Sequence, residues 1–192
     1  EAFKISGLDW FWDEEEYRKL LQKSGGTTRI QDFAKKSQVE IDGRKIRNLK
    51  TQIFNEYLNK HKSEPREGVV EIIEYSKKNK IKLGFASSTT SNNINSVFNS
   101  LKGRVNKKDF DFIGNNELVL REKPHSDIYE YALNYLKVDE KDCLAIEDTE
   151  ESLKSAMGAN IKCVAFPGKY HTQDKFRGSF ALVDKLSTDL FN

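Results

Sequence analysis

Two adjacent acids, Glu147 and Asp148, directly follow the apolar run Cys143-Leu144-Ala145-Ile146. A run of this kind is typical of a buried parallel strand. Open α/β sheets bind their ligands beyond the carboxyl ends of such strands, so we expect both carboxylates at the mouth of a sheet. Mg²⁺ takes oxygen ligands and usually only one or two protein carboxylates. The pair therefore indicates a magnesium site, provided that another acid joins it. The alternative is a helix start in which Asp148 caps and Glu147 is solvated.

A run of hydroxyl residues, Ser87 to Ser91, follows a second apolar run that ends at Ala86 and precedes a helical pattern around Ile94. The first N–H groups of a helix lack partners, and the helix dipole favours negative charge there. Ser87, Ser88 and Thr89 are therefore candidates for binding a phosphate. Taken alone, the run is more typical of a polar turn with a helix cap.

A third candidate is Lys123, in the segment Arg121 to Asp127. Pro124 disfavours a helical conformation at the residue before it, which predicts that Lys123 lies on an irregular loop. Its ammonium group could then be directed at a charge, although most lysines on loops are solvated. A hydroxyl after one strand, a lysine on a loop and acids after the next strand are together far more specific than any one of them.

The composition excludes several classes of function. Lys and Arg total 32 against 30 Asp and Glu, for a net charge of +2, and no long basic tract indicates nucleic-acid binding. No stretch has the roughly 20 apolar residues of a membrane span. Cys143 and Cys163 lack the spacing of a zinc or redox site, which favours reduced, buried thiols. We expect a cytoplasmic monomer that binds neither membrane nor nucleic acid.

Residues 1–62 have a helical pattern. Asp13 can cap a helix with acids in its first turn, the pair Gly25-Gly26 interrupts the pattern, and a second helix starts from Thr28. A third helix would bury Ile46, Leu49, Ile53, Phe54 and Tyr57 on one side. This half is predicted to be a small helical bundle.

Residues 63–192 alternate short apolar runs with helical segments, which predicts a parallel sheet covered on both faces. The segment containing Pro65 marks the boundary. The expected strands are Ile81 to Ala86, Leu144 to Ile146, Cys163 to Phe166 and Phe180 to Val183. Asp109 to Leu120 suggests a short hairpin-like excursion.

This order of motifs resembles the haloacid dehalogenase superfamily, and within it the CbbY-type sugar phosphatases beside β-phosphoglucomutase. The second motif of the family matches Ser87, the third Lys123 and the fourth Glu147-Asp148. The resemblance covers nearly the whole chain, including Gly25 to Ile30 and Lys123 to Tyr129. It implies an α/β fold with a Rossmann-like parallel core and a small helical cap, and it implies Mg²⁺ as the cofactor.

The resemblance also implies roles for single residues. Ser87 and Lys123 would be catalytic, with Ser88 and Thr89 on the phosphoryl group. Glu147 and Asp148 would hold Mg²⁺. In the cap, Gly26, Arg29 and Lys50 would face the substrate; its second phosphate is a candidate partner of the two cations. For Arg29 and Lys50 the alternative is a solvated charge on a helix surface.

The activity that the resemblance implies is hydrolysis of a small sugar phosphate, with xylulose 1,5-bisphosphate as a candidate substrate. One alternative is a sugar-phosphate mutase, and another is a catalytically dead phosphate-binding protein. The Asp-x-Asp-Gly-Thr-like first motif of the family, which supplies the nucleophile, is absent from the 192 residues. We therefore expect a truncated version of an enzyme whose missing strand lies upstream of Glu1 in the middle of the sheet, and we expect the chain alone to be inactive.

Overall fold

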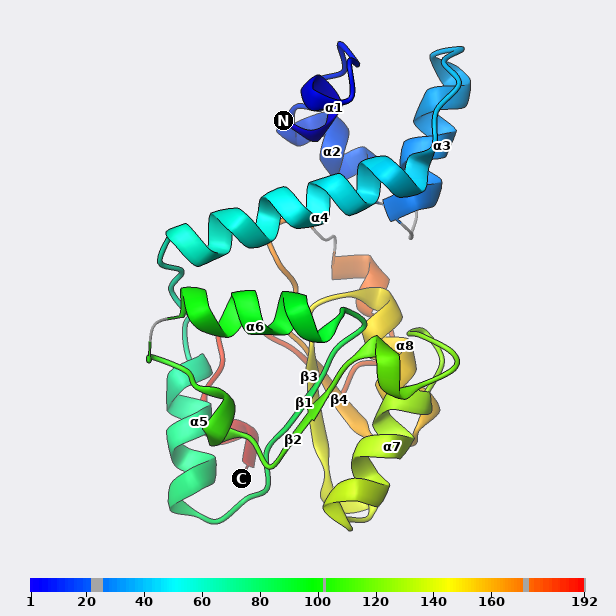
Figure 1. The fold of residues 1–192 in the computed structure, drawn as a ribbon. Coiled ribbons are helices and arrows are strands. Elements are labelled where there is room, and N and C mark those ends of the chain that lie inside the picture. The colour runs from blue at the N-terminus through cyan, green and yellow to red at the C-terminus, as the bar shows by residue number, and fades with distance from the viewer. Residues whose placement is uncertain (22–25, 102, 171–172, 192) are drawn as a thin grey trace. The chain divides into compact units, whose positions relative to one another are not determined.

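The structure is a computed structural model that describes residues 1–21, 26–101, 103–170 and 173–191. The chain divides into two compact units, Glu1–Lys60 and His61–Asn192 (Figure 1). The first unit contains helices and the second alternates helices with strands. We call them the helical unit and the core unit and describe each by itself.

The described residues of the helical unit form four helices. Their bounds are α1 Ala2–Ile5, α2 Glu14–Leu20, α3 Gly26–Lys36 and α4 Gly43–Lys60. The predicted cap is confirmed, because the Glu16 backbone N–H donates to Asp13 Oδ1 at 2.8 Å. Helix α3 begins at Gly26 and not at Thr28 as predicted, while Gly25 lies outside the described residues.

The core of the helical unit combines an aliphatic and an aromatic part. Ile30, Ala34, Ile46 and Leu58 of α3 and α4 are buried. The aromatic part is a set of edge-to-face contacts among Phe3, Trp10, Trp12 and Phe33. The predicted burial of Phe54 and Tyr57 is wrong, since these side chains are 51% and 56% exposed. The polar Asn55 is buried on α4 in the same stretch.

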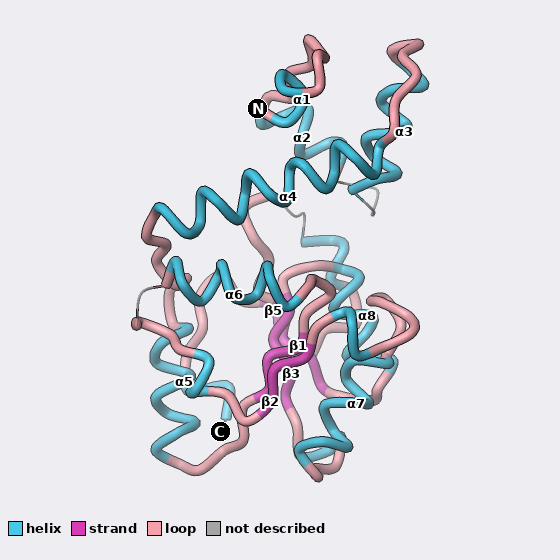
Figure 2. Tube along the Cα trace, viewed as in Figure 1, coloured by secondary structure: helices cyan, strands magenta, loops and turns pink. Residues whose placement is uncertain are grey.

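The described residues of the core unit form four longer helices and five short strands, which Figure 2 distinguishes by colour. The helices are α5 Val69–Lys78, α6 Ser91–Ser100, α7 Asp127–Leu136 and α8 Glu150–Gly158. The strands are β1 Gly84–Ala86, β2 Phe112–Gly114, β3 Leu144–Glu147, β4 Lys162–Ala165 and β5 Ala181–Leu182. Short 3-10 turns connect several of these elements. The predicted α/β class with parallel strands is confirmed.

Among the described residues the strands pair as two parallel sheets, β1-β2 and β3-β4-β5. Gly84 pairs with Phe112 and Ala86 with Gly114 in the first sheet, and Leu144 pairs with Lys162 in the second. The predicted hairpin-like excursion at Asp109 to Leu120 is therefore wrong. A hairpin needs two antiparallel strands within this segment, whereas its strand β2 pairs in parallel with β1.

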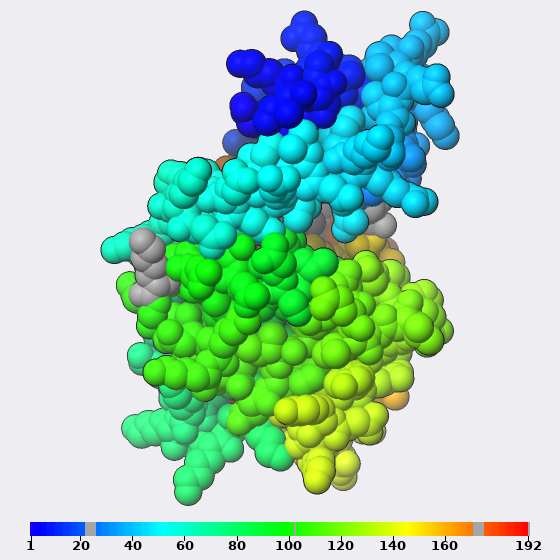
Figure 3. Space-filling model, in the orientation of Figure 1, coloured from blue at the N-terminus to red at the C-terminus, as the bar shows by residue number. Residues whose placement is uncertain are grey.

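Helices cover both faces of the strands. Val69 and Ile73 of α5 and Ile94 and Phe98 of α6 pack in one cluster with Phe85 of β1. On the opposite side, α7 contacts β1 and β2, and α8 packs on β3 and β4. In the central strand β4, every residue after Lys162 is buried. Little of the sequence that follows β3, coloured orange to red, is visible on the face shown in Figure 3. Because both faces are covered, open polar chemistry is confined to the ends of the strands.

No helix among the described residues is both long and apolar enough to cross a membrane.

Candidate active site

The hydroxyl run connects the end of β1 to the start of α6. The Ser87 N–H donates to the carbonyl of Gly114 at 3.1 Å, which continues the parallel pairing of β1 with β2. Thr90 caps α6 and accepts from the Asn93 N–H at 3.4 Å. The capping interpretation is thus correct for Thr90, and Thr89 supports it by accepting from the Asn93 side chain at 2.6 Å. The hydroxyl of Ser87 faces the turn, where it accepts from the Thr89 N–H at 3.4 Å.

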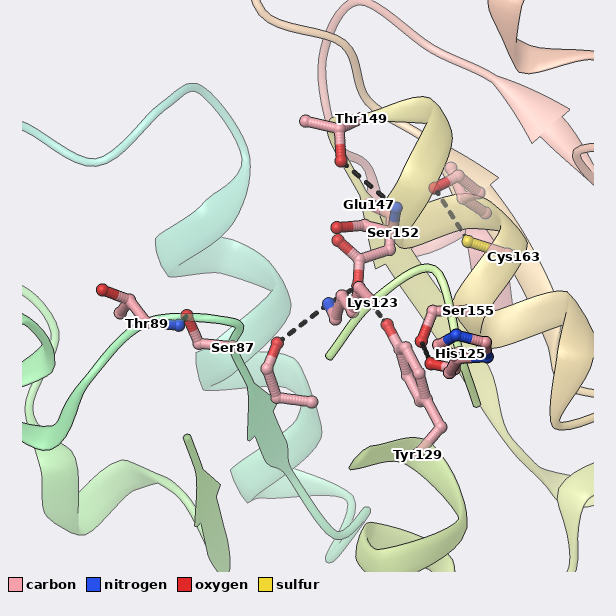
Figure 4. A network of polar contacts seen from close by, with 12 residues as sticks. Ser87, Thr89, Lys123, His125, Tyr129, Glu147, Thr149, Ser152, Ser155 and Cys163 are labelled. Atoms are coloured by element: carbon pink, nitrogen blue, oxygen red, sulfur yellow. Dashed lines mark hydrogen bonds and ion pairs between the residues drawn. The ribbon is translucent and has the colours of Figure 1, made fainter. Parts of the chain in front are cut away.

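Lys123 lies in a turn between β2 and α7, as the proline after it predicted. Its side chain is only 5% exposed, so the solvated alternative is wrong. The ammonium group donates to the carbonyl of Ala86 at 3.1 Å and to the carboxylate of Glu147 (Figure 4). Lys123 thereby connects the carboxyl end of β1 to the carboxyl end of β3. Ser87 directly follows Ala86, whose carbonyl accepts this hydrogen bond from Lys123.

The hydrogen bonds of Lys123 leave part of its donor capacity available. An ammonium group has three N–H donors. Two acceptors among the described residues, Ala86 O and Glu147 Oε1, account for two of them. A phosphoryl oxygen near Ser87 could accept from the third, with little reorganisation because the side chain is already held in place.

Glu147 is the last residue of β3, and its side chain is 11% exposed. Its Oε1 atom accepts from Lys123 and also from the hydroxyl of Tyr129 (Figure 4). Asp148, one residue further on, is exposed. The alternative in which Asp148 caps the following helix is wrong, because Thr149 caps α8 and accepts from the Ser152 N–H at 3.2 Å.

The two acids have the donor chemistry of a magnesium site. Asp148 offers a carboxylate to which no described residue donates a hydrogen bond, and one oxygen of Glu147 is already shared by two donors. Over residues 1–21, 26–101, 103–170 and 173–191 no group of three His, Cys, Asp or Glu side chains is placed to hold a metal ion. The pair therefore fits Mg²⁺ as a partial ligand set that phosphate, water or a further acid would complete.

Two neighbours of the acids, Tyr129 and Cys163, were not predicted as site residues. Burial and, next, the charge of Glu147 raise the pKa of the Tyr129 phenol well above its usual value. The same two causes raise the pKa of the buried Cys163 thiol to about 12, against an opposing effect of Lys123. Both groups therefore stay protonated at neutral pH. The motif Lys123 to Tyr129 contained the tyrosine, but nothing in the spacing indicated where its hydroxyl points.

The helical unit brings together the cap residues that were predicted to bind substrate. Arg29 Nε donates to the carbonyl of Leu20 at 2.9 Å. Partial desolvation and, after it, the charges of Arg29 and Arg47 lower the pKa of Lys50, although the residue as a whole is exposed. A side-chain atom placed on Gly26 would lie 3.9 Å from the Arg47 side chain. The unit thus gathers three cations around Gly26 and the start of α3. Arg47 was missed in the sequence, because nothing distinguished it from the other charges of α4.

The geometry of the core unit and the comparisons with known proteins agree on the class of protein. A model of the haloacid dehalogenase-like hydrolases matches residues 3–166, and the chain belongs to this family. The family and the fold that the resemblance implied are thereby confirmed.

Within this family the chain is similar to CbbY proteins. It is 32% identical to the protein CbbY of Cereibacter sphaeroides over 97% of this chain and 83% of the relative. It is 30% identical to CbbY of Rhodobacter capsulatus, over 97% of this chain and 84% of the relative. A crystal structure of mutant CbbY from Rhodobacter sphaeroides in complex with xylulose-(1,5)bisphosphate superposes with a TM-score of 0.81. That structure is 32% identical, and the match covers 96% of this chain and 83% of the other.

A β-phosphoglucomutase from Clostridium difficile shares the fold, with a TM-score of 0.75 at 22% identity, over 99% of this chain and 83% of the other.

Proposed function

We propose that the protein acts as a Mg²⁺-dependent phosphatase on a small phosphorylated sugar, with a ketopentose bisphosphate such as xylulose 1,5-bisphosphate as the substrate. The observation that carries this proposal is the position of Lys123. Its buried ammonium group contacts both the residue before Ser87 and the carboxylate of Glu147. A single cation thus joins the predicted phosphate loop to the predicted metal acids.

The residues of the core unit would bind and stabilise the phosphoryl group. The Ser87 hydroxyl and the Ser88 N–H would donate to its oxygens, and Lys123 would neutralise the charge that develops on them. Phosphoryl transfer depends mainly on such positioning and electrostatic stabilisation. Asp148 and Glu147 would hold Mg²⁺, which supplies further neutralisation of phosphate charge.

A second phosphate on the substrate is supported by the helical unit. Desolvation and, after it, the charges of Arg29 and Arg47 lower the pKa of Lys50, so its ammonium group is repelled by both guanidinium groups. A dianion bound among them would relieve this repulsion and gain charge-assisted hydrogen bonds. We predicted that residues 1–62 act as a cap that closes over the sugar, and this stays a prediction.

Phosphate release by the complete translation product of the gene tests the proposal. Release of phosphate from xylulose 1,5-bisphosphate that requires Mg²⁺ is the expected result. Binding of the bisphosphate without any turnover would contradict the phosphatase and favour the phosphate-binding protein.

A second assay separates the phosphatase from a mutase. The protein is incubated with a sugar monophosphate and a trace of the corresponding bisphosphate. A mutase returns an isomeric monophosphate and releases no phosphate, whereas the proposed phosphatase releases phosphate.

A further inference from the structure

We propose that Tyr129 is a positioning residue, which holds the Glu147 carboxylate in one orientation and through it aims the Lys123 ammonium group at the phosphoryl group. The part of this proposal in which Lys123 points at a phosphoryl group rests on the proposed function. The contact between the three side chains is a property of the core unit and is tested separately below.

The position of the Tyr129 ring is fixed by packing. Tyr129 lies in the first turn of α7 and packs against the buried cluster of α8, β3 and β4 that contains Leu153, Ala156 and Cys163. A side chain held in this way can deliver its hydroxyl to one point with little loss of entropy on forming the bond. That point is Oε1 of Glu147 (Figure 4).

Glu147 Oε1 accepts from two donors of different kinds. Lys123 supplies a charged donor and Tyr129 a neutral one. With both bonds present, the carboxylate can rotate only by breaking a hydrogen bond in a nearly buried environment, which is costly. Without the phenol, Lys123 is the one donor to the carboxylate among the described residues, and the two charged groups can move together away from the end of β1.

Tyr129 also contacts Lys123 directly, because the ammonium nitrogen lies 5.1 Å from the centre of the tyrosine ring. This contact is a cation–π interaction, which needs the ring and not the hydroxyl. The Tyr129→Phe variant therefore removes only the hydrogen bond and keeps both the packing and the ring contact. Tyr131 and Tyr135 of the same helix are 41% and 61% exposed and provide matched control positions.

The first experiment measures the position of Lys123 without any turnover. The ¹⁵Nζ and ¹Hζ signals of Lys123 are recorded by NMR in the full chain and assigned with Lys123→Arg. We expect Tyr129→Phe to shift and broaden these signals, and Tyr131→Phe to leave them unchanged. Unchanged Lys123 signals in Tyr129→Phe would overturn the proposal, and so would an equal change in Tyr131→Phe.

The second experiment measures the consequence for the reaction in the complete translation product. Groups that orient a ligand or catalytic side chain typically contribute about 10-fold or more to activity. We expect kcat of Tyr129→Phe to fall roughly tenfold with KM nearly unchanged, since the substrate contacts remain. An unchanged kcat alongside shifted Lys123 signals would overturn the catalytic part of the proposal. Absence of turnover in the unsubstituted protein would instead contradict the proposed function, and the NMR result would still decide whether Tyr129 positions Lys123.

Discussion

The ammonium group of Lys123 and the carboxylate of Glu147 form an ion pair in which both side chains are nearly buried, at 5% and 11% exposure. The pair connects a turn before α7 to the last residue of β3. Taking two charges out of water is costly, and their attraction offsets that cost only while both partners are present. The pair therefore couples the site to the stability of the core unit.

Removing one partner of this pair should destabilise the protein. We expect Lys123→Met to lower the free energy of unfolding by roughly 3 kcal/mol, because it leaves the Glu147 charge buried and unpaired. The double variant Lys123→Met with Glu147→Gln should recover most of this loss, since no charge remains. Urea denaturation measures both changes.

The exposed pair between Lys19 and Glu15 provides the control for this measurement, since its side chains are 71% and 67% exposed. Lys19→Met should have no measurable effect on stability. Equal effects of Lys19→Met and Lys123→Met on the free energy of unfolding would show that burial of the Lys123–Glu147 pair has no energetic consequence.

Asp148 should be essential for turnover and dispensable for the fold. Its side chain is exposed, and no described residue donates a hydrogen bond to it. We expect Asp148→Asn to lower Mg²⁺-dependent phosphate release by the complete translation product by more than about 100-fold, since even groups outside the first ligand shell contribute 10-fold to 100-fold. The melting temperature should not change. Asp142→Asn, at another exposed acid, should keep full activity, and normal turnover of Asp148→Asn would remove Asp148 from the metal site.

The strands that position these acids could be predicted from the sequence, because short apolar runs bounded by polar turns admit few other structures. Strand β2 could not be recognised, since Phe112-Ile113-Gly114 is too short to show a pattern and becomes a strand only through pairing with β1. The hydrogen bond between Tyr129 and Glu147 could not be predicted from the sequence either. It depends on how α7 packs against β3, and side-chain directions across elements are not encoded in local spacing.

Arg29 should contribute to binding and not to the chemical step. It belongs to the group of cations in the helical unit, where its side chain is anchored by a bond of 2.9 Å to Leu20 O. We expect Arg29→Ala to weaken binding of xylulose 1,5-bisphosphate roughly tenfold, which corresponds to about 1.4 kcal/mol. Binding of inorganic phosphate should change far less, because one phosphate can still occupy the core unit.

Titration calorimetry with both ligands checks this expectation. Lys35→Ala, at an exposed position near the end of the same helix, is the control and should not affect either affinity. An equal loss of affinity for both ligands in Arg29→Ala would argue against a separate subsite for the second phosphate.

Gly68 should be required by the fold for two separable reasons. It precedes α5 with a φ of +85°, and a Cβ atom there would lie 2.1 Å from the backbone oxygen of Leu186. Gly103 has nearly the same φ, +83°, but nothing lies within 4 Å of its Cβ position. We expect Gly103→Ala to cost about 1 kcal/mol from the left-handed conformation alone. Gly68→Ala should cost several times more, because two backbone segments must separate. Equal melting temperatures of the two variants would contradict this account.

Asp109 should make the stability of the core unit depend on pH in the acidic range. Its carboxylate accepts from the Lys77 ammonium group at 2.6 Å and from the Asn106 N–H at 2.7 Å. The hydrogen bond from Lys77 is the main cause that holds the pKa of Asp109 below its usual value. A lowered pKa in the folded state means that the unfolded chain binds the proton more readily. The stabilisation is therefore complete above the unfolded pKa of about 3.9 and is lost as the pH falls through the folded value.

This sign predicts that the stabilities of the protein and its Asp109→Asn variant converge as the pH falls. At pH 7 the variant should be less stable by about 1.5 kcal/mol, the lower end of the range for a hydrogen bond to a charged group, because the Lys77 side chain is half exposed. The difference should shrink as the pH falls through the folded pKa of Asp109, because the carboxyl group of the unsubstituted protein then becomes protonated and uncharged as well. Urea denaturation from pH 2 to pH 7 measures this convergence. Asp139→Asn serves as the control. The Asp139 side chain is 71% exposed, and its ion pair with Lys141 is long, at 3.7 Å, so its charge should contribute little to stability. A difference for Asp109→Asn that is independent of pH would mean that the side chain contributes through its shape and not through its charge.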